Sequence, residues 1–149
     1  MQREALLAQV VEGTRITDGH AQAAAGDKIA RQLTGDDLEV VLELLKHEDE
    51  QVVRMVACVL TSNSLVNVFG DTPAFMAMMR GLCEVIGRGR PLASFQAVET
   101  IYNWAIIKPF DISGAQLQQV RTMIEQAIEA TADQDNKDYL GDSLRFLKG

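Results

Sequence analysis

Apolar residues recur at helical spacing along nearly the whole chain, and one set of them returns at a fixed distance. Leu38, Val41 and Leu45 lie on one face of an expected helix, and the matching apolar patterns that begin at Met79 and Val120 follow at an interval of 41 residues. No segment of useful length alternates between apolar and polar residues, so the sequence gives no reason to expect a sheet. The sequence therefore predicts an all-α fold built from similar helical units.

Short polar segments divide the chain into pairs of helices, which predicts stacked antiparallel hairpins. The segments within pairs are residues 46–50, 87–90 and 132–135. The expected hairpins span residues 36–68, 73–107 and 113–147, preceded by two atypical capping helices in residues 1–33. A chain of 149 residues with 47% hydrophobic content can bury one continuous core. We therefore predict a single all-α domain, residues 1–149, of about seven to eight helices.

Capping residues predict where individual helices begin and end. Gly13 is expected to close the first helix in the left-handed conformation that glycine adopts readily. Asp49 is expected to cap one helix, and Thr72-Pro73 another, with proline at the first helical position. Ser113 to Gln116 predicts a capping box, in which the two side chains bond each other's backbone N–H groups. Pro109 must end the helix before it, because proline disfavours helical geometry in the preceding residue.

The sixth expected helix combines an apolar stripe with the only tryptophan of the chain. The predicted stripe consists of Phe95, Val98, Tyr102 and Ala105. Trp104 lies near the end of this helix, where an exposed tryptophan would serve as a binding anchor. In a helix that ends against another hairpin, a tryptophan more often belongs to the core, and we expect that position here.

The segment from Leu38 to Leu60, LEVVLELLKHEDEQVVRMVACVL, resembles a HEAT repeat. It has a leucine-rich first helix, an acidic turn that includes Asp49, and Val53-Arg54 in the second helix. In that family the arginine commonly bonds turn acids between neighbouring repeats, so the resemblance implies a structural role for Arg54. The resemblance extends loosely over residues 38–147 and implies a short right-handed α-solenoid, although the turn is one residue longer than usual and the Val-Arg pair does not recur. A plain helical bundle of antiparallel hairpins is the alternative.

The residue pattern predicts neither catalysis nor a bound cofactor. His20 and His47 have no second ligand at helical spacing, so no metal site is expected. Cys58 and Cys83 lie among apolar residues in the middle of expected helices, where a thiol behaves as a small buried hydrophobe. No nucleophile elbow or phosphate-binding glycine loop is present. We therefore expect no enzymatic activity, no catalytic residues, no metal and no cofactor.

The charge of the chain constrains its partners and its location. The net charge is −7, so an extended surface for nucleic acid would work against the field of the whole molecule, whereas a basic partner fits it. Acidic surfaces also serve solubility alone. The first residues do not form a signal-peptide core, and no segment approaches a membrane span. We expect a cytoplasmic protein with both cysteines reduced.

A protein-binding module is the function that this pattern favours. Stacked hairpins present a broad curved face, and in HEAT-like proteins the second helices line its inner side. The resemblance therefore points to Gln96, Glu99 and Asn103, which share the polar side of the sixth helix, with Arg54 and Asn63 as further candidates. An inhibitor or immunity-type protein that neutralises a basic partner is one form of this function.

The only local basic cluster of the acidic chain suggests two other possibilities. The cluster consists of Arg80 and of Arg88 and Arg90, which belong to a Gly-Arg-Gly-Arg-Pro turn. This turn could bind an acidic partner or a phosphate, or serve as a solvated connector. The alternative function is a nucleic-acid-binding protein similar to the DNA-repair glycosylases with HEAT-like repeats. That function requires one groove that collects basic side chains beside an aromatic residue. The candidates are Arg54, Arg80, Arg88, Arg90 and Arg121, with Trp104.

Overall fold

The computed structural model describes residues 1–69 and 72–147, and within them it is entirely helical. The long helices are α1 (Arg3–Thr14), α2 (Gly19–Ala30), α3 (Leu38–Leu44), α4 (Glu50–Val59), α6 (Thr72–Gly87), α7 (Pro91–Ile107), α8 (Gly114–Ala130) and α9 (Gln134–Phe146). The short elements are α5 (Val66–Phe69) and two 3₁₀ turns at Gly35–Asp37 and Asn63–Leu65. No strand occurs in these residues, so the predicted all-α class is confirmed.

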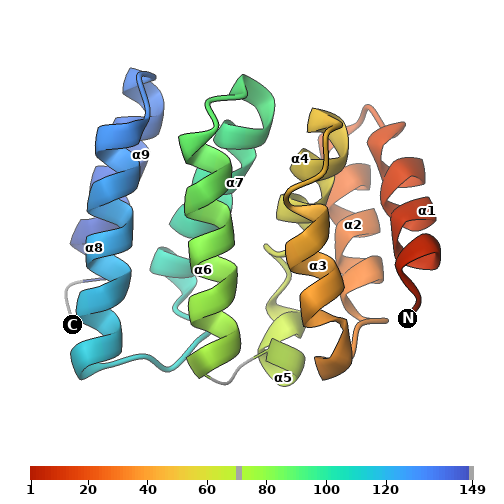
Figure 1. Ribbon diagram of the computed structural model, residues 1–149, viewed down its shortest axis with the longest axis horizontal. Coiled ribbons are helices and arrows are strands. Elements are labelled where there is room, and N and C mark those ends of the chain that lie inside the picture. The colour runs from red at the N-terminus through yellow and green to blue at the C-terminus, as the bar shows by residue number, and fades with distance from the viewer. Residues whose placement is uncertain (70–71, 148–149) are drawn as a thin grey trace.

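The eight long helices form four hairpins that lie side by side along the long axis of the molecule (Figure 1). In the first layer α6 packs between α3 and α8, with α1 at the end. In the second layer α7 packs between α4 and α9, and α2 packs on the other side of α4. Helix α7 therefore has neighbours on three sides, because it also contacts its hairpin partner α6.

Several predicted helix ends are confirmed, and others are wrong. Asp49 caps α4 by accepting the Gln51 N–H at 2.9 Å, and α7 ends at Ile107, before Pro109. The predicted capping box at residues 113–116 is absent, since Ser113 precedes α8 but its side chain makes no capping bond. The predicted cap at residue 72 concerns a side chain outside the described residues.

Gly13 has a different role from the predicted one. It lies inside α1, which ends at Thr14, and does not take a left-handed conformation. A Cβ atom at this position would lie 2.7 Å from Cε of Met55, a residue with no exposed surface. Gly26 of α2 similarly faces the backbone and thiol of Cys58. The two glycines therefore allow α1 and α2 to approach α4 closely.

One continuous core runs through the molecule, from Leu6 in α1 to Leu140 in α9. Trp104 is 4% exposed, so its predicted place in the core is confirmed. The predicted stripe of α7 is wrong in part, because Phe95 is 41% exposed and Tyr102 is only half-buried. Helix α7 instead buries a face that includes Ala97, Val98 and Ile101, since contact with α4 requires small and branched side chains there.

Three side chains of α7 donate hydrogen bonds to main-chain carbonyl groups at the C-terminal end of α4. The pairs are Thr100 Oγ1 to Ala57 O (2.9 Å), Trp104 Nε1 to Leu60 O (2.9 Å) and Asn103 Nδ2 to Thr61 O (3.2 Å). Carbonyl groups at a helix end lack partners within the helix, and burial without a hydrogen bond is costly. These bonds therefore set the position of one hairpin against the next.

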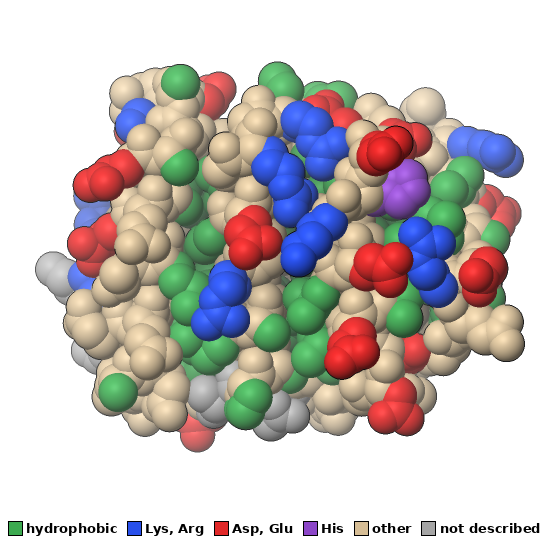
Figure 2. All heavy atoms as spheres, in the orientation of Figure 1, with side chains coloured by type: hydrophobic (Ala, Val, Ile, Leu, Met, Phe, Trp, Pro, Cys, Tyr) green, Lys and Arg blue, Asp and Glu red, His purple; other side chains and the backbone are tan. Residues whose placement is uncertain are grey.

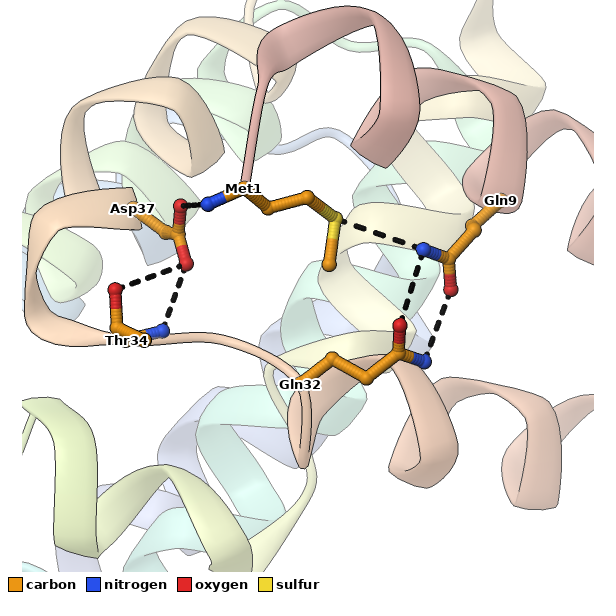
Figure 3. A network of polar contacts seen from close by, with 5 residues as sticks. All are labelled: Met1, Gln9, Gln32, Thr34 and Asp37. Atoms are coloured by element: carbon orange, nitrogen blue, oxygen red, sulfur yellow. Dashed lines mark hydrogen bonds and ion pairs between the residues drawn. The ribbon is translucent and has the colours of Figure 1, made fainter.

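A polar network joins the start of the chain to the turn before α3 (Figure 3). The Met1 ammonium group lies 2.7 Å from Asp37, whose carboxylate also accepts the Thr34 N–H at 2.7 Å, while the Gln9 and Gln32 amides bond each other. Burial alone would raise the pKa of Asp37, but the ammonium group and Thr34 outweigh it and the pKa is lowered. This network holds α1 and α2 against the first residues of α3.

In the part of the chain that the structure describes, no single helix has both the length and the apolar character needed to cross a membrane. One strongly bent pair, Glu50–Val59 with Asn63–Phe69, satisfies the same criteria together, with a bend of 68°.

The close approach at Gly13 leads to a stability prediction. Gly13→Val should lower the free energy of unfolding by about 1–3 kcal/mol, because its side chain overlaps buried Met55. Gly141→Val in α9 is the matched control, since a Cβ at Gly141 meets nothing within 4 Å. Urea unfolding followed by circular dichroism measures both variants. Equal stability of the two variants would contradict the assigned role of Gly13.

Candidate binding groove on the second helical layer

A groove of about 620 Å³ crosses the second layer and receives side chains from all four of its helices. Its lining residues are Gly19, Gln22, Ala23, Cys58, Thr61, Gln96, Glu99, Tyr102, Asn103, Ile106 and Tyr139. The hollow arises because α2 and the end of α4 contribute mostly small side chains, whereas α7 and α9 contribute larger ones. Helix α4 therefore forms a recessed floor between higher walls.

Glu99 is the only charged residue among the described residues that line this groove. It makes no ion pair or hydrogen bond with any described residue, and the residue as a whole is exposed. Burial by the groove walls raises the pKa of Glu99 above its usual value of 4.5. An unpaired, partly desolvated carboxylate of this kind is suited to receive a cation.

Two side-chain amides flank Glu99 on α7. Gln96 lies one turn before it and Asn103 one turn after it, and both line the groove. The Asn103 amide nitrogen is engaged with Thr61, which directs the amide group and leaves its oxygen as an acceptor. The groove therefore offers a carboxylate and nearby amide oxygens as acceptors, which is the complement of a lysine or arginine side chain.

A partly exposed aromatic cluster lies beside these acceptors, where α7 meets α9. Its members are Phe95, Tyr102, Tyr139 and Phe146. Tyr139 is 39% exposed and Phe146 44% exposed, and the Tyr102 and Tyr139 rings meet edge-to-face with centroids 5.3 Å apart. Sequence reasoning missed Tyr139 and Phe146. Their seven-residue spacing places them on one side of α9 and could have indicated a second apolar stripe.

The structure brings Gln96, Glu99 and Asn103 together but places the other two predicted binding residues elsewhere. Arg54 donates to Gln51 at 2.9 Å and to Gln22 at 2.8 Å, and it does not line the groove. The resemblance implied turn acids as its partners, and the structure shows glutamine amides instead. Asn63 is exposed on a 3₁₀ turn outside the groove lining.

Two of the three arginines of the predicted basic cluster, Arg88 and Arg90, connect hairpins. Arg88 donates to the carbonyl oxygen of Leu45 at 2.8 Å, and Arg90 donates to those of Glu48 at 2.8 Å and His47 at 3.2 Å. Both therefore tie the α6–α7 turn to the turn after α3.

Arg80 is exposed and lines a shallow depression with Lys46, between α3 and α6. Figure 2 shows the face of the first layer, where Lys and Arg side chains gather over α3 and α6. These cations thus occupy a different layer from the groove that holds Glu99.

Neither cysteine has the environment of a nucleophile. Burial raises the pKa of the Cys58 thiol at the groove floor, although nearby Arg54 opposes the effect. Burial raises the pKa of Cys83 to about 12. Both thiols are free, and the described residues contain no group of three potential metal ligands.

No protein-family model matches the sequence, and no curated protein shows significant similarity to it. The geometry of the groove is therefore the basis on which a function can be proposed.

The raised pKa of Glu99 predicts a pH-dependent effect on stability. Because the folded state favours the protonated form, ionisation of Glu99 lowers stability above its folded pKa, and the effect disappears below the usual value of 4.5. Glu99→Gln should therefore be more stable than the wild type at pH 7.5 and equally stable at pH 4. Urea unfolding at both pH values tests this, with exposed Glu125→Gln of α8 as the control. A loss of stability at pH 7.5 in Glu99→Gln would mean that its charge is already paired.

Proposed function

We propose that this chain is a non-enzymatic protein-binding module whose second helical layer holds a partner segment that carries a lysine or an arginine. The observation that carries the proposal is the unpaired carboxylate of Glu99 inside a groove of about 620 Å³. As part of the proposal, the hairpins form a short right-handed solenoid of the HEAT-like type, in which the second helices line the inner face.

The groove supports a cation on chemical grounds. An ammonium or guanidinium group beside Glu99 would form a charge-assisted hydrogen bond, and the amide oxygens of Gln96 and Asn103 could accept its remaining protons. The rings of Tyr102 and Tyr139 line the same groove and can interact with a cation through their faces. A carboxylate on the partner would meet only repulsion from Glu99.

The aromatic cluster supports an apolar anchor next to the cation. Partly exposed aromatic side chains are a frequent source of binding energy in protein interfaces. Phe95, Tyr139 and Phe146 already pack against neighbouring rings, so they lose little conformational freedom when a partner covers them. The partner segment therefore combines a basic residue with one or more apolar residues.

The charge of the molecule supports a basic protein as partner. The net charge of −7 attracts it at long range, and Asp135 lies one turn before Tyr139 along α9, whereas Asp142, one turn after it, already pairs with Arg145. An inhibitor or immunity-type protein that neutralises a basic partner is the specific form we propose, acting in the cytoplasm, where both free thiols would stay reduced.

Nucleic-acid binding has less support from the arrangement of arginines. That function needs them in one groove, but Arg54 bonds Gln22, Arg88 reaches the turn after α3, and Arg121 donates to the Leu144 carbonyl at 2.9 Å. Titration with short single- and double-stranded DNA at low salt separates the two functions. Salt-dependent binding would favour the nucleic-acid alternative, and a flat titration would exclude it.

Selection from a random dodecapeptide phage library on the immobilised protein tests the proposal. We expect enrichment of peptides with lysine or arginine beside aromatic or aliphatic residues. For such a peptide, Glu99→Gln should weaken binding about tenfold, the effect of losing one charge-assisted bond. Tyr139→Ser should also weaken it, while Glu125→Gln should not change the Kd.

A double-mutant cycle gives the decisive control. The cycle combines Glu99→Gln with a peptide in which methionine replaces the basic residue. If that residue contacts Glu99, the two changes together should reduce the binding free energy no more than either change alone. Additive losses, or selected peptides that lack basic residues, would contradict the proposal.

A further inference from the structure

A second concavity lies on the other side of α7, between α6, α8 and the segment that joins α7 to α8. Its volume is about 100 Å³. The described residues that line it are apolar except for Lys108, and they include Phe75, Trp104 and Phe110. It shares no lining residue with the Glu99 groove. The cavity is therefore a separate site, and a ligand bound in it would be independent of the proposed function.

Three aromatic rings keep this cavity open. The ring centroids of Phe75 and Phe110 are 4.5 Å apart, and those of Trp104 lie 5.4 Å from Phe75 and 5.3 Å from Phe110. The indole is fixed at its other edge by the hydrogen bond to the Leu60 carbonyl. These contacts restrict rotation of the rings into the space, and an apolar cavity can take up an apolar guest.

Lys108 is the only charged residue among the described residues that line the cavity. It is the only non-glycine residue with a positive φ in the described part of the chain, at φ 52° and ψ 52°. This conformation is unfavourable for a residue with a Cβ atom, and it ends α7 immediately before Pro109. The ammonium group is exposed and has no ion pair or hydrogen bond with a described residue. A lysine thus lines an apolar cavity and has no charged partner among the described residues.

We propose that this cavity binds a small aliphatic or aromatic monocarboxylic acid. The tail lies among Phe75, Ile101 and Trp104, and the carboxylate pairs with the Lys108 ammonium group. An apolar cavity of roughly 150 Å³ holds the six carbons of benzene, so this smaller cavity fits a linear tail of about four to five carbons, with its polar end at the open side. A single cation matches a single negative charge, which favours a monocarboxylate over a phosphate or a dicarboxylate.

The fluorescence of Trp104 reports directly on this site, because it is the only tryptophan of the chain and its ring lines the cavity. Titration with butanoate, pentanoate and hexanoate should change the emission in a saturable way. The affinity should rise about fourfold for each added methylene group, the factor expected for burying one such group. Hexanol should bind at least fivefold more weakly than hexanoate, and hexylamine should give no saturable change.

Two variants test separately how the carboxylate and the apolar tail of the ligand are bound. Lys108→Met should weaken hexanoate to the level of hexanol, whereas Lys28→Met, an exposed lysine on α2, should leave the hexanoate titration unchanged. Leu117→Phe narrows the cavity and should weaken hexanoate and hexanol alike. Circular dichroism spectra confirm that each variant is folded.

Three results would overturn the proposal. The absence of a saturable change with any acid shows that the cavity does not admit ligands. Equal affinity for hexanoate, hexanol and hexylamine shows that Lys108 plays no part in recognition. An unchanged hexanoate affinity in Lys108→Met leads to the same conclusion, whatever the behaviour of Leu117→Phe.

Discussion

The architecture depends on how the main-chain carbonyl groups at the ends of its helices are satisfied. Among the described residues, Gly89 and Lys108 are the two that follow a helix in the left-handed conformation, so the other helix ends lack this local closure. Side chains from a neighbouring helix donate to these carbonyl groups instead. The donors are Gln22 to Gly13, Arg88 to Leu45, Ser94 to Ile86, Thr100 to Ala57, Trp104 to Leu60, Arg121 to Leu144 and Lys137 to Ile128. The carbonyl groups of Gly13 and Ile86 also accept a backbone N–H, and each side-chain bond positions two segments relative to each other.

Helix α7 shows how this constraint produces the two sites. Its Thr100 and Trp104 fix α7 on α4, and the resulting position leaves Glu99 over the recessed end of α4. The opposite edge of the Trp104 ring forms a wall of the apolar cavity. The groove and the cavity are therefore two sides of one helix, held by the same contacts. A change that displaces α7 would be expected to affect both.

Much of the helical organisation could be predicted from the sequence, because apolar spacing and capping residues act locally. The effects of Asp49 and Pro109 on helix boundaries depend only on residues next to them in the sequence, and both predicted effects are confirmed. The predictions for Gly13 and Phe95 are wrong because the roles of these residues depend on tertiary contacts. Gly13 lies close to Met55, and Phe95 lies at the partly solvated edge of the contact between α7 and α9. Glu99 was identified through its place on a second helix, but its unpaired state and desolvation require the arrangement of the surrounding helices.

Side-chain bonds from α7 to the end of α4 add to the continuous core in holding one hairpin against the next. Thr100 and Thr122 make the most direct comparison, because each hydroxyl bonds the carbonyl group four residues earlier but only Thr100 also reaches another hairpin. Replacing each by valine and measuring the free energy of unfolding in urea compares the buried Thr100 hydroxyl, whose proton is shared with Ala57 of the next hairpin, with the exposed Thr122 hydroxyl. We expect a loss of about 1–2 kcal/mol for Thr100→Val and a change within about 0.5 kcal/mol for Thr122→Val. Equal stabilities of the two variants would contradict this role of the bonds between hairpins.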